Sequence, residues 1–198
     1  WEPAFTTQVG SAWQGNGLEL MNTETIAFHP FNPDLLWVGY DDMGLFRSED
    51  GGTSFIRLDP VMDPIIGSLA DVDAVKDIQV DPANGDLYIS RYQGSQGGYE
   101  ADFSSGGVVF SDDKGDTQIE ISSGLPSGRC DLYLDKQSGE PGSRILYAAV
   151  FHYGVHKSTN SGETWIEINN GLGTGKEYAW EIINDPSDTE ILYLGLNS

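Results

Sequence analysis

The sequence predicts an all-β protein, a β-propeller made of four-stranded antiparallel blades. A Ser-x-Asp/Asn-x-Gly pattern occurs three times, at 48–52, 111–115 and 158–162, and each copy lies between short apolar segments. Two further strand-like segments precede each copy, so a unit of roughly fifty residues carries four short strands, the size of a propeller blade. No segment shows a sustained helical period. A β-sandwich of unrelated strands would not repeat this order three times.

Each copy of the pattern has the composition of a hairpin turn. The short polar side chain at its third position can bond to the backbone of a turn, and the glycine at its fifth position can adopt the positive φ that such turns need. Apolar and polar residues alternate after the turn, as in residues 165–168, which indicates a half-buried strand. The pattern therefore joins the third strand of each blade to the fourth.

The expected strands follow the same order in every repeat. They are 25–28, 35–40, 44–47 and 55–58; 77–80, 86–90, 107–110 and 117–121; 131–134, 145–150, 154–157 and 165–168; and 180–183 and 191–195. We assign residues 24–60 to blade 1, 61–123 to blade 2, 124–170 to blade 3 and 171–198 to the first half of blade 4. Within residues 1–23, Trp1–Phe5 is expected to be a strand that closes the last blade of the ring.

The repeated pattern resembles the Asp-box, also called the bacterial neuraminidase repeat. The segments 29–39 and 44–52 and the linkers 123–126 and 170–173 fit this resemblance. Propellers of sialidases, sortilin-type receptors and xyloglucan-cleaving glycoside hydrolases carry such repeats, which implies an extracellular or cell-surface location. The resemblance also implies that the turns lie on the outer side of the blades and are structural. Their residues are Ser48, Asp50, Gly52, Phe55, Ser111, Asp113, Gly115, Ser158, Asn160, Gly162 and Trp165.

Three and a half blades do not close a ring, because propellers usually have four to eight and closure protects the strand edges. We therefore expect either that the chain is part of a longer propeller or that copies assemble through their unpaired blade edges.

Composition limits the partners. The formal net charge is −21, from 31 acidic and 10 basic residues, which opposes binding to nucleic acid and disfavours anionic membrane surfaces. The sequence has no transmembrane run, so membrane insertion is not expected. No cofactor is expected. Ca²⁺ is possible at Asp41-Asp42, Asp71-Val72-Asp73 and Asp112-Asp113, although none has EF-hand spacing, and no metal ligands are assigned. The single cysteine, Cys130, is expected to be a buried structural thiol.

Two glycosidase activities can be compared with the sequence. The arginines of a sialidase site lack their expected context here. In the inverting xyloglucan-cleaving enzymes, two separated carboxylates act as acid and base. The segment 41–47 resembles the stretch that holds one of them, and Asp42 aligns with the catalytic residue. The second belongs to the other half of the propeller in that family, so this chain alone should be catalytically incomplete.

The longest insertion, 92–107, is a candidate binding loop because long loops on a repeat scaffold often bind ligands. Tyr92, Tyr99 and Phe103 in it could stack on sugar rings. We expect a non-catalytic extracellular module that binds protein or carbohydrate. The alternative is the N-terminal part of a polysaccharide-cleaving glycoside hydrolase.

Overall fold

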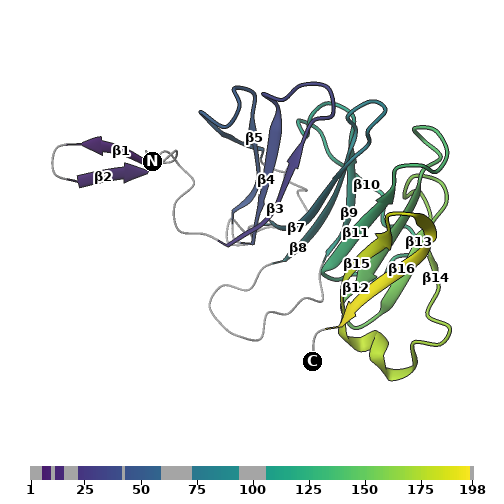
Figure 1. Cartoon of the computed structure of the whole chain (residues 1–198). Coiled ribbons are helices and arrows are strands. Elements are labelled where there is room, and N and C mark those ends of the chain that lie inside the picture. Colours follow the sequence, from purple (N-terminus) through teal and green to yellow (C-terminus); the bar gives the residue numbers. More distant parts are fainter. Residues whose placement is uncertain are drawn as a thin grey trace.

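A computed structural model describes residues 6–9, 12–15, 22–41, 43–58, 73–93 and 106–196. These residues form three four-stranded antiparallel sheets and two two-stranded sheets. The three larger sheets and one of the smaller ones lie side by side as successive blades (Figure 1). The chain is thus an all-β propeller segment of about three and a half blades, and the predicted fold class is confirmed. No helix among the described residues is long and apolar enough to cross a membrane.

The blades repeat one strand order, from the inner strand outward. Blade 1 contains β3 (Thr23–Phe28), β4 (Leu36–Tyr40), β5 (Gly44–Ser48) and β6 (Ile56–Leu58); blade 2 contains β7 (Asp73–Val80), β8 (Leu87–Gln93), β9 (Gly106–Ser111) and β10 (Ile119–Glu120); blade 3 contains β11 (Cys130–Asp135), β12 (Ile145–Val150), β13 (Gly154–Ser158) and β14 (Ile166–Glu167). The outermost strands of blades 2 and 3 are shorter than the sequence predicts, with two paired residues each.

The fourth blade is a half-blade of two strands, β15 (Ala179–Asp185) and β16 (Asp188–Leu196). A 3₁₀ helix, η1 (Gly173–Tyr178), leads into it. Near the other end of the chain, β1 (Thr6–Val9) and β2 (Ala12–Gly15) form a hairpin that Figure 1 shows apart from the blades. Trp1–Phe5 lies outside the described residues, so the closing strand stays a prediction, as do the blade boundaries.

The core lies between the blades. Each inner strand packs over the first two strands of the preceding blade: β7 over β3 and β4, β11 over β7 and β8, and β15 over β11 and β12. Three apolar clusters fill these interfaces, centred on Trp37, Tyr88 and Tyr147 in turn. At the first interface the approach is so close that a Cβ on Gly39 would meet Val75 Cγ1 at 2.5 Å.

The three Ser-x-Asp/Asn-x-Gly turns have one geometry. In the first, Ser48 Oγ accepts the Gly52 N–H at 2.9 Å and donates to Asp50 Oδ1 at 2.8 Å, and Asp50 Oδ1 accepts the Ser54 N–H at 2.8 Å. Equivalent bonds occur in the other two turns. The fifth-position glycines all have φ near 90°. Side chain and backbone therefore satisfy each other within the turn.

Cys130 is buried at the start of β11, as the sequence predicts. Burial raises the pKa of its thiol to about 12. Such a thiol stays protonated and inert at neutral pH.

Candidate functional site

The candidate site lies at one end of the blades, where the inner strands begin and the second strands end. The registers place Thr23 opposite Tyr40, Ala74 opposite Tyr92, and Cys130 opposite Val150. We call this the strand-start end. The Ser-x-Asp/Asn-x-Gly turns lie at the opposite end, the turn end, because they join the far ends of the third and fourth strands.

The sequence-predicted site residues relate to this end in different ways. Asp42, Tyr99 and Phe103 lie outside the described residues, so the structure gives no position for them. Asp41 and Met43, which flank Asp42, follow β4 and precede β5 at the strand-start end. The segment that holds Tyr99 and Phe103 leaves from β8 and returns to β9 there, since Tyr92 pairs with Gly106.

Tyr92 requires a correction. It lies in β8 and not in a loop, and its side chain is 2% exposed. Its hydroxyl donates to Asp41 Oδ1, and the Arg129 guanidinium lies 5.3 Å from its ring centroid. Burial and the bond to Asp41 raise the pKa of its hydroxyl. The ring is packed inside the blades, so it is not available to stack on a sugar.

Arg129 is the centre of the described site. Its Nη2 donates to Glu24 Oε2 at 3.1 Å, and its guanidinium lies 3.9 Å from the ring centroid of Trp180. Phe151 meets the Trp180 ring edge to face at 5.7 Å. The guanidinium is thus held between aromatic rings by a carboxylate from another blade, a geometry in which a planar cation gains both stacking and charge pairing.

A second ion pair continues from the same carboxylate. Lys76 Nζ lies 3.3 Å from Glu24 Oε2 and 3.7 Å from Asp131 Oδ1. Glu24 belongs to blade 1, Lys76 to blade 2, and Arg129 and Asp131 to blade 3. Charged side chains from three blades therefore form one network, and Trp180 adds the fourth blade.

The carboxyl group of Asp131 has an unusual electrostatic position. Burial, and then the neighbouring Asp77, raise its pKa to about 7, and the Ile182 N–H donates to its Oδ2 at 2.9 Å. Burial also raises the pKa of Asp77, whose Oδ2 accepts the Leu132 N–H at 3.2 Å. A carboxyl that titrates near neutrality suits an acid catalyst, but structural networks shift pKa values too. Here both carboxyls are engaged in bonds between blades.

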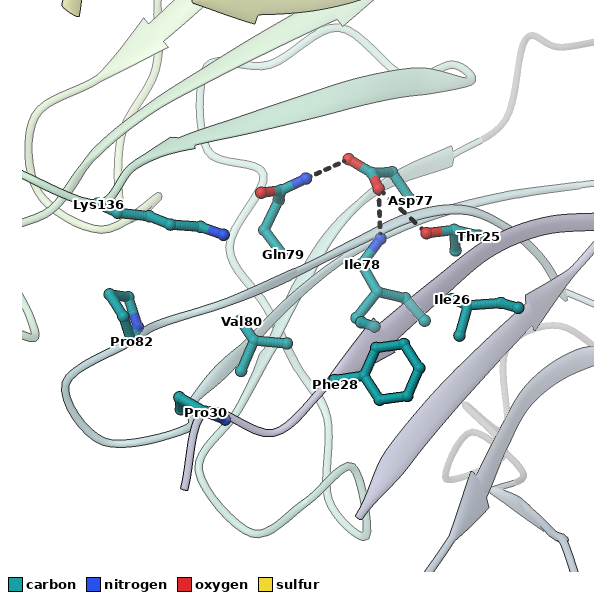
Figure 2. A pocket seen from close by; sticks show the side chains of 11 residues that line it. Thr25, Ile26, Phe28, Pro30, Asp77, Ile78, Gln79, Val80, Pro82 and Lys136 are labelled. Carbon is teal, nitrogen blue, oxygen red and sulfur yellow. Dashed lines mark hydrogen bonds between the residues drawn. The ribbon is translucent and has the colours of Figure 1, made fainter. Parts of the chain in front are cut away.

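A groove with a volume of about 470 Å³ lies along the inner strands β3 and β7 (Figure 2). Ile26, Phe28 and Val80 form its apolar part, and Gln79 and Lys136 supply polar groups. Figure 2 also shows Asp77 bound to Gln79, to the Ile78 N–H and to Thr25 at the edge of this groove.

The described residues contain no group of three or more side chains suited to hold a metal ion. Of the predicted calcium pairs, Asp113 uses both carboxylate oxygens for Thr117. The other pairs are described only in part. Calcium binding therefore stays a prediction.

No protein-family model matches the sequence, and no curated protein matches it. Solved structures do. The GH74 enzyme of Niastella koreensis matches with a TM-score of 0.63 at 17% identity, over 92% of this chain and 30% of that one. The GH74 xyloglucanase of Xanthomonas campestris matches at 0.58 and 15%, over 96% and 28%, and an ancestral GH74 enzyme at 0.55 and 20%, over 79% and 20%.

These likenesses show the propeller fold. The chain spans between 20% and 30% of the length of those enzymes, so their activity is not transferred to it by the match.

Sequence reasoning missed Glu24, Arg129 and Trp180. Each lies at or just before the start of an inner strand, where an alternating pattern carries no signal for charge pairing across blades. An alignment of the inner strands with one another would have placed these three residues at the same end of the blades. It would not have shown that their side chains are in contact.

Proposed function

We propose that the chain is a propeller segment of an extracellular protein that binds a neutral polysaccharide at its strand-start end. The observation that carries the proposal is the convergence of four blades on Arg129 and Trp180. The guanidinium is fixed by Glu24, and the indole ring beside it is partly exposed. A rigid aromatic face next to fixed polar groups suits a sugar ring with its hydroxyls.

Charge supports a neutral ligand. A net charge of −21 repels acidic polymers and does not act on an uncharged chain. The fold likeness to a xyloglucanase makes xyloglucan the first neutral ligand to examine. The resemblance of the turns to the Asp-box supports an exported protein, in which these turns build the scaffold and the opposite end binds.

The test is a calorimetric titration of the chain with xyloglucan oligosaccharides and with polygalacturonate, an acidic polymer. Saturable binding of the neutral ligand alone is expected. Trp180→Ala should weaken binding roughly tenfold, because an aromatic face is lost. Phe31→Ala is the matched control, since Phe31 is an exposed aromatic residue in the β3–β4 turn at the turn end. Absence of binding, or equal loss in both variants, would refute the proposal.

The second candidate function is catalytic: the chain would contribute one residue to the active site of a polysaccharide-cleaving enzyme. The likeness to GH74 enzymes and the resemblance of the segment 41–47 to the stretch that holds a catalytic carboxylate in the xyloglucan-cleaving enzymes favour it. Asp42 would be one carboxylate of an inverting pair whose partner lies elsewhere in a longer protein. Release of reducing sugar from xyloglucan by a longer protein that contains this segment and the second carboxylate, abolished in Asp42→Asn, would support cleavage over binding alone.

A further inference from the structure

The half-blade β15–β16 has one face that corresponds to the face of blades 1, 2 and 3 that packs against the next blade. The chain forms that interface between blades three times. In each blade the inner strand presents alternate residues to the preceding and the following blade. In each blade the second strand carries one aromatic residue that faces the following blade. From blade 1 to the half-blade these residues are Trp37, Tyr88, Tyr147 and Tyr193. Their partners on the inner strands are, in the same order, Ala27, Gln79, Tyr133 and Ile183. The first three aromatic residues are at most 7% exposed, whereas Tyr193 is 52% exposed and Ile183 54%.

Blade 1 has the complementary surface, an exposed apolar side of its inner strand. In its inner strand β3, Ala27 packs against blade 2, and Ile26 and Phe28 lie on the other side of the strand, where they also line the groove of Figure 2. They hold the positions that Ile78 and Val80 occupy in β7. Ile78 and Val80 are buried against blade 1, whereas Ile26 is 55% exposed and Phe28 62%. At every existing interface the inner strand contacts the first two strands of the preceding blade, so β3 is the strand that would cover β15 and β16.

A repeated hydrogen bond gives the interface its register. Asp77 accepts the N–H of Leu132 in the next blade, and Asp131 accepts the N–H of Ile182 in the next. Glu181 holds the same position in β15, two residues before Ile183, and is exposed. The equivalent N–H on the other side is that of Ile26, one residue after Thr25.

We propose that a second copy of the chain docks head to tail on this face, with its β3 lying over β15 and β16 and its Ile26 N–H opposite Glu181. The surfaces that meet are different on the two partners, so the contact is heterologous. Two such contacts close a ring of two copies. Each copy brings three four-stranded blades and one half-blade, so the ring has six four-stranded blades and two half-blades, and this number of blade positions lies within the usual range of propellers.

The test uses sedimentation velocity on the whole chain at about 100 µM, where an interface of micromolar affinity is occupied. The unmodified chain should sediment as two copies. Ile26→Asp and Tyr193→Asp each spoil one of the two faces, and each variant alone should be monomeric. An equimolar mixture should recover a two-copy species, because the intact β3 of one variant meets the intact half-blade of the other.

A second measurement isolates the hydrogen bond. Glu181→Ala should weaken the two-copy species roughly tenfold, as loss of a charged hydrogen bond does, while Glu190→Ala should not. Glu190 is an exposed residue of β16 that alternates with Ile191 and so lies on the other side of the strand. A chain that stays monomeric would overturn the proposal in favour of a blade from the same polypeptide. Two-copy species in both aspartate variants alone would overturn it in favour of another face.

Discussion

The turn carboxylates Asp50 and Asp113 and the inner-strand carboxylates Asp77 and Asp131 all accept backbone N–H groups, yet their pKa values move in opposite directions. Hydrogen bonds from Ser54 lower the pKa of Asp50 to about 2, and bonds from Thr117 lower that of Asp113. Burial raises the pKa of Asp131 to about 7 and also raises that of Asp77. Water still solvates the charge at the turns, whereas between the inner strands desolvation exceeds the gain from the bonds.

The comparison separates two structural tasks. A turn carboxylate bonds within five residues of itself and closes a hairpin. An inner-strand carboxylate bonds to the next blade, more than fifty residues away. The bonds inside each turn are therefore local and repeat almost unchanged, although the second turn also bonds to blade 1, where Trp37 Nε1 and Arg47 Nη1 donate to Lys114 O. The carboxylates of the inner strands depend instead on how the blades meet.

The largest effect on stability is expected at a turn glycine that lies against the neighbouring blade. At Gly162, φ is 88° and a Cβ would meet Ile121 Cδ1 at 2.4 Å. Gly162→Ala should destabilise the chain by about 2–5 kcal/mol, combining left-handed backbone strain with overpacking. Urea unfolding at pH 7 measures the change.

Gly52→Ala is the matched control, because its φ is also 88° but the nearest atom is 3.9 Å away. It should lose only the backbone part, about 1–2 kcal/mol. Equal losses at both glycines would show that the contact between position 162 and Ile121 adds no packing constraint to the turn.

An intermediate effect is expected from Asp131. Its folded pKa of about 7 lies above its ordinary value of 3.8, so its contribution to stability is complete below about pH 4 and is lost as the pH rises through 7. Asp131→Asn keeps an oxygen for the Ile182 N–H but has no charge to desolvate. The variant should gain stability relative to the unmodified chain between pH 4 and 8, on the order of 2–4 kcal/mol.

Urea unfolding across that pH range, with Asp188→Asn as a control at an exposed carboxyl of β16, tests this expectation. Parallel profiles for the unmodified chain and Asp131→Asn would mean that Lys76 offsets the desolvation of the carboxylate in full.

The same contrast explains what the sequence could and could not predict. The three turns, the blade order and buried Cys130 follow from local pattern, since Ser48, Asp50 and Gly52 carry their partners within a few residues. Asp77 and Asp131 are ordinary strand residues in the sequence. Their shared position with Thr25 and Glu181 emerges only once the strand registers are known. Tyr92 was predicted to lie in a loop because the glycine-rich segment after it hides the end of β8.

The smallest effect on stability is expected from Asp50→Asn, because the third turn carries asparagine at the same position. Asn160 replaces the aspartate there, and its Oδ1 still accepts the Thr164 N–H at 3.0 Å. Asp50→Asn should therefore keep the turn, and at pH 7 it should lose only the small contribution that the charge makes at this exposed site. The aspartate's lowered pKa adds stability that is present above about pH 4 and lost as the pH falls through 2. An NMR titration of the Asp50 carboxyl measures that pKa, and a value near 4 would show that Ser48 and Ser54 hold the turn without favouring its charge.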